Sequence, residues 1–128
     1  MSRHDILIDS GILIAYLQGD EQIAIRFRSL LAANSIFVTP VSVSEILSRL
    51  RSREEQKIEK IFEIIKVIDI DKEIGKIAGS ILNRYDCYIG SALIAAAAES
   101  LSLQLWTNTP ERYPSLPSES FWIFERSR

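Results

Sequence analysis

The sequence has few of the residues on which many catalytic and metal sites depend. Its 128 residues include one cysteine, Cys87, and one histidine, His4. A single cysteine excludes an internal disulfide and a thiolate metal cluster, and it favours a reducing compartment. We interpret Cys87 as a packing residue. Because His4 has no nucleophile beside it, a Ser-His-Asp or Cys-His site is not indicated.

Glycine-rich loops, long apolar runs and excess positive charge are also missing. The first predicted strand is followed by DSGIL, which is neither a Walker-type loop nor a dinucleotide fingerprint. The longest apolar run, residues 92–98, is too short to span a bilayer, and the N-terminus lacks the apolar core of a signal peptide. We therefore expect a cytoplasmic protein. Its net charge of −2 provides no overall field that would attract a polyanion.

The apolar residues, 47% of the chain, alternate between strand and helix patterns. The patterns predict strands at residues 6–8, 36–38, 67–70, 103–106 and 121–124. They predict helices at residues 12–17 with Ser10 as cap, around 23–31 ending at Asn34, from Ser42 to about residue 50, and at 58–65, 72–83 and 91–99. This alternation predicts one α/β domain over residues 1–128, with a mainly parallel sheet covered on both faces.

Two acidic residues follow predicted strands. Asp9 comes directly after residues 6–8, and Glu45 stands shortly after residues 36–38. Ligands of open α/β sheets bind at the carboxyl ends of the strands, so the two carboxylates are candidates for one acidic pocket. Such oxygen ligands suit Mg²⁺ or Mn²⁺. Each acid also has a structural alternative, because Asp9 can cap the following helix and Ser42 with Glu45 matches a capping box.

Three arginines form a local basic cluster. Arg49, Arg51 and Arg53 lie on or just beyond the helix predicted to carry Glu45. They are candidates for RNA contacts. The alternative is a solvated helix end, where cations meet the negative end of the helix dipole.

Three segments occur in an order that resembles the PIN-domain family, and within it the small VapC-type toxin nucleases: ILIDSGILIAYL, VSVSEIL and SALIAAAAESLSLQLWTNTPERYP. The resemblance covers most of the chain. It implies a three-layer α/β/α fold and Mg²⁺- or Mn²⁺-dependent endoribonuclease activity. It also matches Asp9 with Ser10, Glu45 and Thr107 to the family's site positions.

Two positions depart from the pattern of that family. Ser91 stands where the resemblance expects the Asp of a D-A-x-I-A-A motif, and Thr109 stands where it expects Asp or Asn. Asp9 and Glu45 alone provide little negative charge with which to hold two metal ions. Asp86, the amide oxygen of Asn108, or the substrate phosphate could replace the missing ligand. Asp86 could equally be a turn residue, and Ser91 an N-cap.

Two functions stay open at this point. The first is an endoribonuclease in which Asp9 and Glu45 hold one metal ion. The second is an inactive PIN-like module that binds RNA or a protein. The resemblance further implies a small antitoxin-like partner and a homodimer, and an apolar stripe on the first helices would suit either contact unless it belongs to the core.

Overall fold

The centre of the computed structural model, which describes residues 5–33 and 35–123, is a sheet of four parallel strands. Their order is β3-β2-β1-β4, with bounds Lys66–Val67 for β3, Ile36–Val38 for β2, Ile6–Ile8 for β1 and Gln104–Trp106 for β4. Ile6 pairs with Ile36 on one side and with Gln104 on the other. The predicted parallel sheet is therefore confirmed, and β1 lies inside it.

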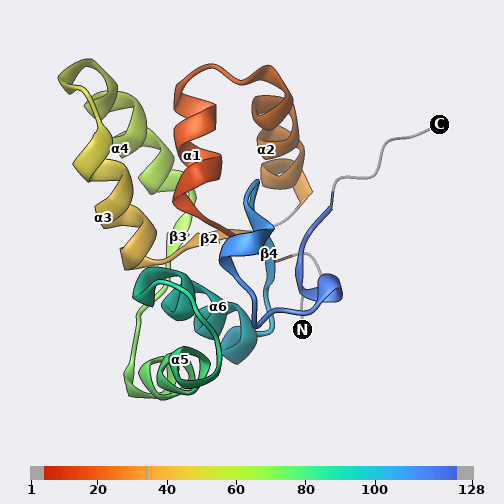
Figure 1. The fold of residues 1–128 in the computed structure, drawn as a ribbon. Helices are drawn as coiled ribbons and strands as arrows, with labels where there is room; N and C mark the ends of the chain where they lie inside the picture. Colours follow the sequence, from red (N-terminus) through yellow and green to blue (C-terminus); the bar gives the residue numbers. More distant parts are fainter. Residues whose placement is uncertain (1–4, 34, 124–128) are drawn as a thin grey trace.

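Six helices cover the two faces of this sheet. They are α1 (Ser10–Leu17), α2 (Glu21–Ala33), α3 (Pro40–Arg49), α4 (Glu55–Ile64), α5 (Lys72–Arg84) and α6 (Ile89–Leu101). Figure 1 shows α1 to α4 on one side of the sheet and α5 with α6 on the other. Short 3-10 turns cover Ser52–Glu54, Pro110–Arg112 and Ser118–Ser120. The expected three-layer α/β/α fold is present.

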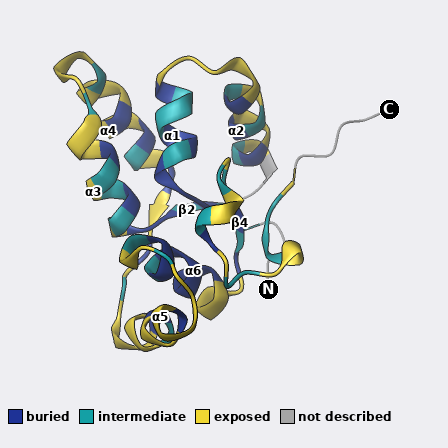
Figure 2. Cartoon of the chain, viewed as in Figure 1, coloured by how far each residue is buried: buried dark blue, intermediate teal, exposed yellow. Residues whose placement is uncertain are grey.

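The alternation of side chains along the strands produces two separate apolar clusters. Ile6 and Ile8 pack with α1 to α4, whereas Leu7 between them packs with α5 and α6. Successive strand residues point to opposite faces, so one buried tripeptide contributes to both layers. Figure 2 shows this buried centre, with exposed residues mainly on the outer sides of the helices.

The apolar stripe of the first helices belongs to this core. Ile12, Leu13 and Leu17 of α1 and Phe27 of α2 are all buried in the cluster on that face. The stripe is therefore not the surface that would meet a partner. No helix in the described part of the chain is long and apolar enough to cross a bilayer.

Three of the predicted strands differ from those observed, and β4 differs only by starting at Gln104 instead of residue 103. β3 covers Lys66–Val67 rather than residues 67–70, because Ile68 turns into the core below α5 after donating one hydrogen bond to the Val38 carbonyl. The predicted strand at 121–124 is reduced to a bridge between Phe121 and Leu105, directly after a 3-10 turn. The expectations that involve His4, Asn34 and Phe124 lie outside the described residues.

Candidate active site

Asp9 is the first residue after the central strand and the N-cap of α1. Its Oδ1 accepts a hydrogen bond from the Ile12 amide at 3.2 Å, and the residue is only 2% exposed. The expectation that Ser10 caps this helix is wrong, because Ser10 is already its first residue. The end of β1 and the start of α1 together fix the carboxylate at the carboxyl edge of the sheet.

Two hydroxyl groups hold the other oxygen of Asp9. Thr107, directly after β4, donates from Oγ1 to Asp9 Oδ2 at 2.5 Å, and the hydroxyl of Tyr113 donates to the same oxygen at 2.8 Å. A carboxylate offers about four acceptor positions, and these donors with the Ile12 amide occupy three. The open position is therefore on Oδ1. Sequence reasoning missed Tyr113, since no local pattern marks it.

Burial makes the charge of Asp9 costly. Desolvation raises the pKa of Asp9 above its ordinary value, although hydrogen bonds from Thr107, Tyr113 and the Ile12 amide, and the charge of Arg112, act in the opposite direction. Burial, followed by the Asp9 charge, raises the pKa of Tyr113, so this hydroxyl keeps its proton and remains a donor. A cation beside Asp9 would compensate the buried charge.

Glu45 lies on α3 and faces the first turn of α1. Its Oε1 accepts a hydrogen bond from Ser10 Oγ at 2.9 Å. The capping-box alternative is wrong: α3 begins at Pro40, and the Thr39 side chain caps it by accepting from the Ser42 amide at 3.2 Å. The Glu45 charge also contributes to the raised pKa of Tyr113, so both carboxylates act on the same hydroxyl.

The two positions that depart from the PIN pattern have different environments. Ser91 is inside the first turn of α6, whose cap is Tyr88, so its predicted capping role is wrong. Ser91 is 1% exposed and its Oγ has no hydrogen-bond partner within the described residues. Thr109, in contrast, donates its amide to Thr107 Oγ1 at 3.0 Å. It thereby supports the threonine that holds Asp9.

Asn108 and Asp86 differ in their relation to Asp9. A Cβ placed on Gly11 would lie 3.0 Å from Asn108 Oδ1 and 3.5 Å from Asp9 Oδ1, so both oxygens lie close to Gly11 at the start of α1. Asp86 is exposed in the loop before α6. Across residues 5–33 and 35–123, no three His, Cys, Asp or Glu side chains are grouped to hold a metal ion. This arrangement does not bring Asp86 into a three-carboxylate group with Asp9 and Glu45.

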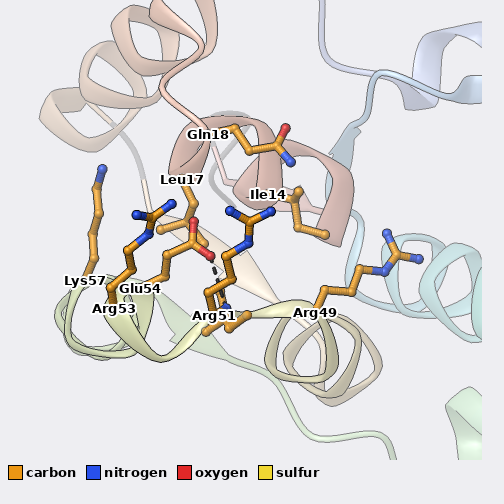
Figure 3. Close-up of a pocket in the computed structure, with 9 residues that line it drawn as sticks. Ile14, Leu17, Gln18, Arg49, Arg51, Arg53, Glu54 and Lys57 are labelled. Atoms are coloured by element: carbon orange, nitrogen blue, oxygen red, sulfur yellow. Dashed lines mark hydrogen bonds between the residues drawn. The ribbon is translucent and has the colours of Figure 1, made fainter.

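The predicted arginines line a pocket of about 620 Å³ next to this site. We call it the basic pocket and define it by its charged residues, Arg49, Arg51, Arg53, Glu54 and Lys57. Its opposite wall is the second half of α1, and in Figure 3 the side chains of Arg51 and Arg53 extend toward that wall.

The oxygen donors around Asp9 fit one hard divalent cation. They are the free position of Asp9 Oδ1, the Glu45 carboxylate and the Asn108 amide oxygen. Mg²⁺ is commonly held by one or two carboxylates, with waters and substrate phosphate completing its ligands. Two carboxylates are few for a pair of such ions.

Comparison with known proteins places these features in a family. Residues 6–108 match the family model described as the PIN domain. Ribonuclease VapC10 of Mycobacterium tuberculosis is 28% identical over 114 residues, which cover 85% of this chain and 86% of the relative.

Two solved structures share the fold at low sequence identity. One is VapBC2 from Rickettsia felis bound to a promoter DNA fragment, with a TM-score of 0.77 and 15% identity over 91% of this chain and 95% of that chain. The other is a toxin-antitoxin complex from Klebsiella pneumoniae, with a TM-score of 0.74 and 20% identity over 92% and 96%. The family match spans β1 to β4 and includes Asp9, Glu45 and Thr107, so this chain belongs to the PIN domain family.

Proposed function

We propose that this protein is a metal-dependent endoribonuclease of the toxin type that hydrolyses RNA phosphodiesters at Asp9 and Glu45. The observation that carries this proposal is the buried carboxylate of Asp9, oriented by Thr107 and Tyr113 and left with one open acceptor position. A folded protein gains no stability from a desolvated carboxylate unless something compensates it. Similarity to a named ribonuclease supports RNA as the substrate.

A single Mg²⁺ or Mn²⁺ ion is part of the proposal. PIN-domain ribonucleases of the VapC type generally depend on a divalent metal. Here Asp9 and Glu45 would hold the ion, with the Asn108 amide oxygen as a neutral neighbour. When bound, such an ion supplies positive charge at the phosphate and lowers the pKa of a bound water.

The residues of the chain then have distinct tasks. Thr107 and Tyr113 hold Asp9 through Oδ2, which leaves the open acceptor position on Oδ1. Ser10 holds Glu45 in place through its hydroxyl group. Because these groups are fixed before substrate arrives, little reorganisation is needed when charge develops on the phosphate.

Mn²⁺ titration calorimetry of the native chain and Asp9→Asn is the first test. We expect binding of about one ion per chain, lost in Asp9→Asn. Asp71→Asn is the matched control, because Asp71 caps α5 through the Ile74 amide just as Asp9 caps α1, but lies on the other face of the sheet. RNA cleavage should fall about 10³-fold in Asp9→Asn and stay unchanged in the control. Undiminished cleavage by Asp9→Asn would refute the assignment.

A metal-free module that binds RNA is the second candidate. The observation in its favour is that Ser91 and Thr109 supply hydroxyl groups where the PIN pattern has acidic or amide side chains. In that case calorimetry detects no Mn²⁺ binding, while RNA is retained on a filter at low salt and released as salt rises. Retention that does not depend on salt counts against this candidate.

A protein partner completes the proposal. The fold neighbours include a toxin-antitoxin complex, which supports a small antitoxin-like partner and a homodimer for this chain as well. Tyr88 and Ile89, at the start of α6, are 77% and 67% exposed and are available to such a contact. Sedimentation velocity at micromolar concentration tests the dimer, and a single monomeric species would contradict it.

A further inference from the structure

The basic pocket and the acidic site are carried by the same two helices, α1 and α3. Asp9 and Ser10 stand at the start of α1, and the second half of the same helix forms one wall of the basic pocket. Glu45 and Arg49 are four residues apart on α3, which is one helical turn or about 6 Å of axial rise. Because α1 also packs against α3, the carboxylates and the arginines lie along the same pair of helices.

The charges of the basic pocket are not balanced within the protein. It contains four cations and one carboxylate, in a chain whose net charge is −2. Glu54 uses Oε1 to accept a hydrogen bond from the Arg51 backbone amide at 3.2 Å. Among the described residues, Arg49, Arg51 and Arg53 form no ion pair. Lys57 lies over the ring of Tyr16, 5.4 Å from its centroid, and also has no carboxylate partner there.

Helix stability does not explain this cluster. Arg49 ends α3, where a cation meets the negative end of the dipole. Arg53, however, stands just before α4, and Lys57 lies near the beginning of that helix. At a helix N-terminus the dipole is positive and disfavours a cation. Two of the four cations are therefore placed against the local field, as expected for a site that binds an anion.

We propose that the basic pocket binds backbone phosphates of the RNA strand next to the bond that is cut. This inference rests on the proposed function. The scissile phosphate lies at Asp9 and Glu45. The neighbouring phosphates of the strand lie at Arg49, Arg51 and Arg53, at and beyond the end of α3. Arginine suits this task because its planar guanidinium donates two hydrogen bonds to a phosphate. A separate acidic peptide would not require the arginines to begin one helical turn from Glu45, so the arrangement favours RNA.

RNA binding by an Arg51→Gln/Arg53→Gln double variant tests the proposal. Both side chains are exposed, so the fold should tolerate the change. The matched control is Lys72→Gln/Lys76→Gln, which removes two exposed cations from α5 on the opposite face of the sheet. Each pair is combined with Asp9→Asn, which prevents cleavage during the measurement, and binding of a short single-stranded RNA is measured at several salt concentrations.

We expect the arginine variant to bind about tenfold more weakly and the lysine control to bind normally. The slope of log affinity against log salt should fall by about 1.4, because each phosphate contact on a single strand contributes about 0.7. In the Asp9-containing protein the arginine variant should raise KM more than it lowers kcat. Equal RNA affinity in the two variants would overturn the proposal, as would loss of binding only to an acidic peptide such as poly-glutamate.

The same measurements separate this proposal from the proposed function. If the native chain cleaves no RNA but loses RNA binding in the arginine variant, the basic pocket is a phosphate site and the nuclease assignment is wrong. If the native chain cleaves RNA and the arginine variant changes neither KM nor affinity, the nuclease assignment holds and the pocket proposal is wrong.

Discussion

The two ends of the surface between α1 and α3 are organised in opposite ways. At the acidic end, Asp9 is buried, and three donors determine how its oxygens point: the nearby Ile12 amide, and the hydroxyl groups of Thr107 and Tyr113, which are 98 and 104 residues away in the sequence. At the other end, the cations of the basic pocket are exposed, and its arginines have no ion-pair partner among the described residues. At the acidic end, hydrogen bonds within the protein fix the orientation of the carboxylate. At the basic end, the positive charges stay available to a ligand.

This difference follows from what each end is proposed to do. A group that holds a reacting phosphate must be oriented in advance, because small displacements there lower the rate strongly. Long-range attraction of a flexible RNA strand needs only net positive charge on side chains that extend into solvent. The acidic end should therefore be sensitive to the loss of single atoms, and the basic end to the total charge.

Replacing Asp9 by Ala should have the largest effect on stability. The change leaves the hydroxyl groups of Thr107 and Tyr113 without their acceptor and removes the cap of α1. We expect a loss of about 3 kcal/mol in the free energy of unfolding, measured by urea denaturation without metal. Arg51→Ala, at the basic end, should change it by less than about 0.5 kcal/mol. Equal losses would show that the two ends do not differ in this way.

Removing one hydroxyl group from the acidic end is the next test. Tyr113→Phe deletes one of the two donors to Asp9 Oδ2 and should cost about 1.5 to 2 kcal/mol of stability, with weaker Mn²⁺ binding. Tyr16→Phe is the control, because Tyr16 packs against Phe27, with ring centroids 5.0 Å apart, and does not contact Asp9. A Tyr113→Phe protein with native metal affinity would mean that Thr107 alone orients the carboxylate.

Adding a carboxylate at Ser91 should strengthen metal binding. Ser91 Oγ is buried and has no hydrogen-bond partner in the described part of the chain, and Ser91→Asp restores the residue type of the PIN pattern. We expect Mn²⁺ affinity to rise about tenfold, which is about 1.4 kcal/mol. Ser91→Asn has a similar size without the charge and should not show this gain. Unchanged affinity in Ser91→Asp would place Ser91 outside the metal site.

The smallest effect that we expect is in the pH dependence of stability without metal. Burial raises the pKa of Asp9 in the folded protein above its ordinary value of 3.8. The contribution of protonated Asp9 to stability is therefore fully present below pH 3.8 and is lost as the pH rises through the pKa of the folded protein. The Asn side chain of Asp9→Asn cannot ionise. Over that pH range the free energy of unfolding of the native protein should therefore fall relative to that of Asp9→Asn. Parallel curves for the two proteins would contradict the raised pKa.

Much of the fold follows from local pattern. The β-branched runs at Ile6–Ile8 and Ile36–Val38 are strands with the predicted bounds, because three apolar residues buried on both faces leave little choice of structure. Helix starts were harder to predict. Asp9 and Thr39 are the caps of α1 and α3, and Ser10 and Ser42 lie inside those helices, since several polar residues within a few positions could each serve as the cap.

The candidate site was only partly predictable for a different reason. Asp9 and Glu45 could be found because each follows a strand, and local sequence reports that position. Tyr113 could not be found in this way, since its contact with Asp9 spans 104 residues and depends on how the 3-10 turn Pro110–Arg112 docks. The basic pocket was only indicated by its arginines, because Lys57 and the wall from α1 join it through tertiary packing.

The long sequence separation of the Asp9 partners has a consequence for synthesis. Asp9 leaves the ribosome early, but Thr107 and Tyr113 follow 98 and 104 residues later. Until they emerge, β1 lacks its neighbour β4 and the Asp9 carboxylate lacks both hydroxyl donors. Closing contacts between such distant segments is a late event in folding. A nascent chain can therefore build most of its helices while the proposed nuclease site is still incomplete, so the site would become active only after Thr107 and Tyr113 have emerged.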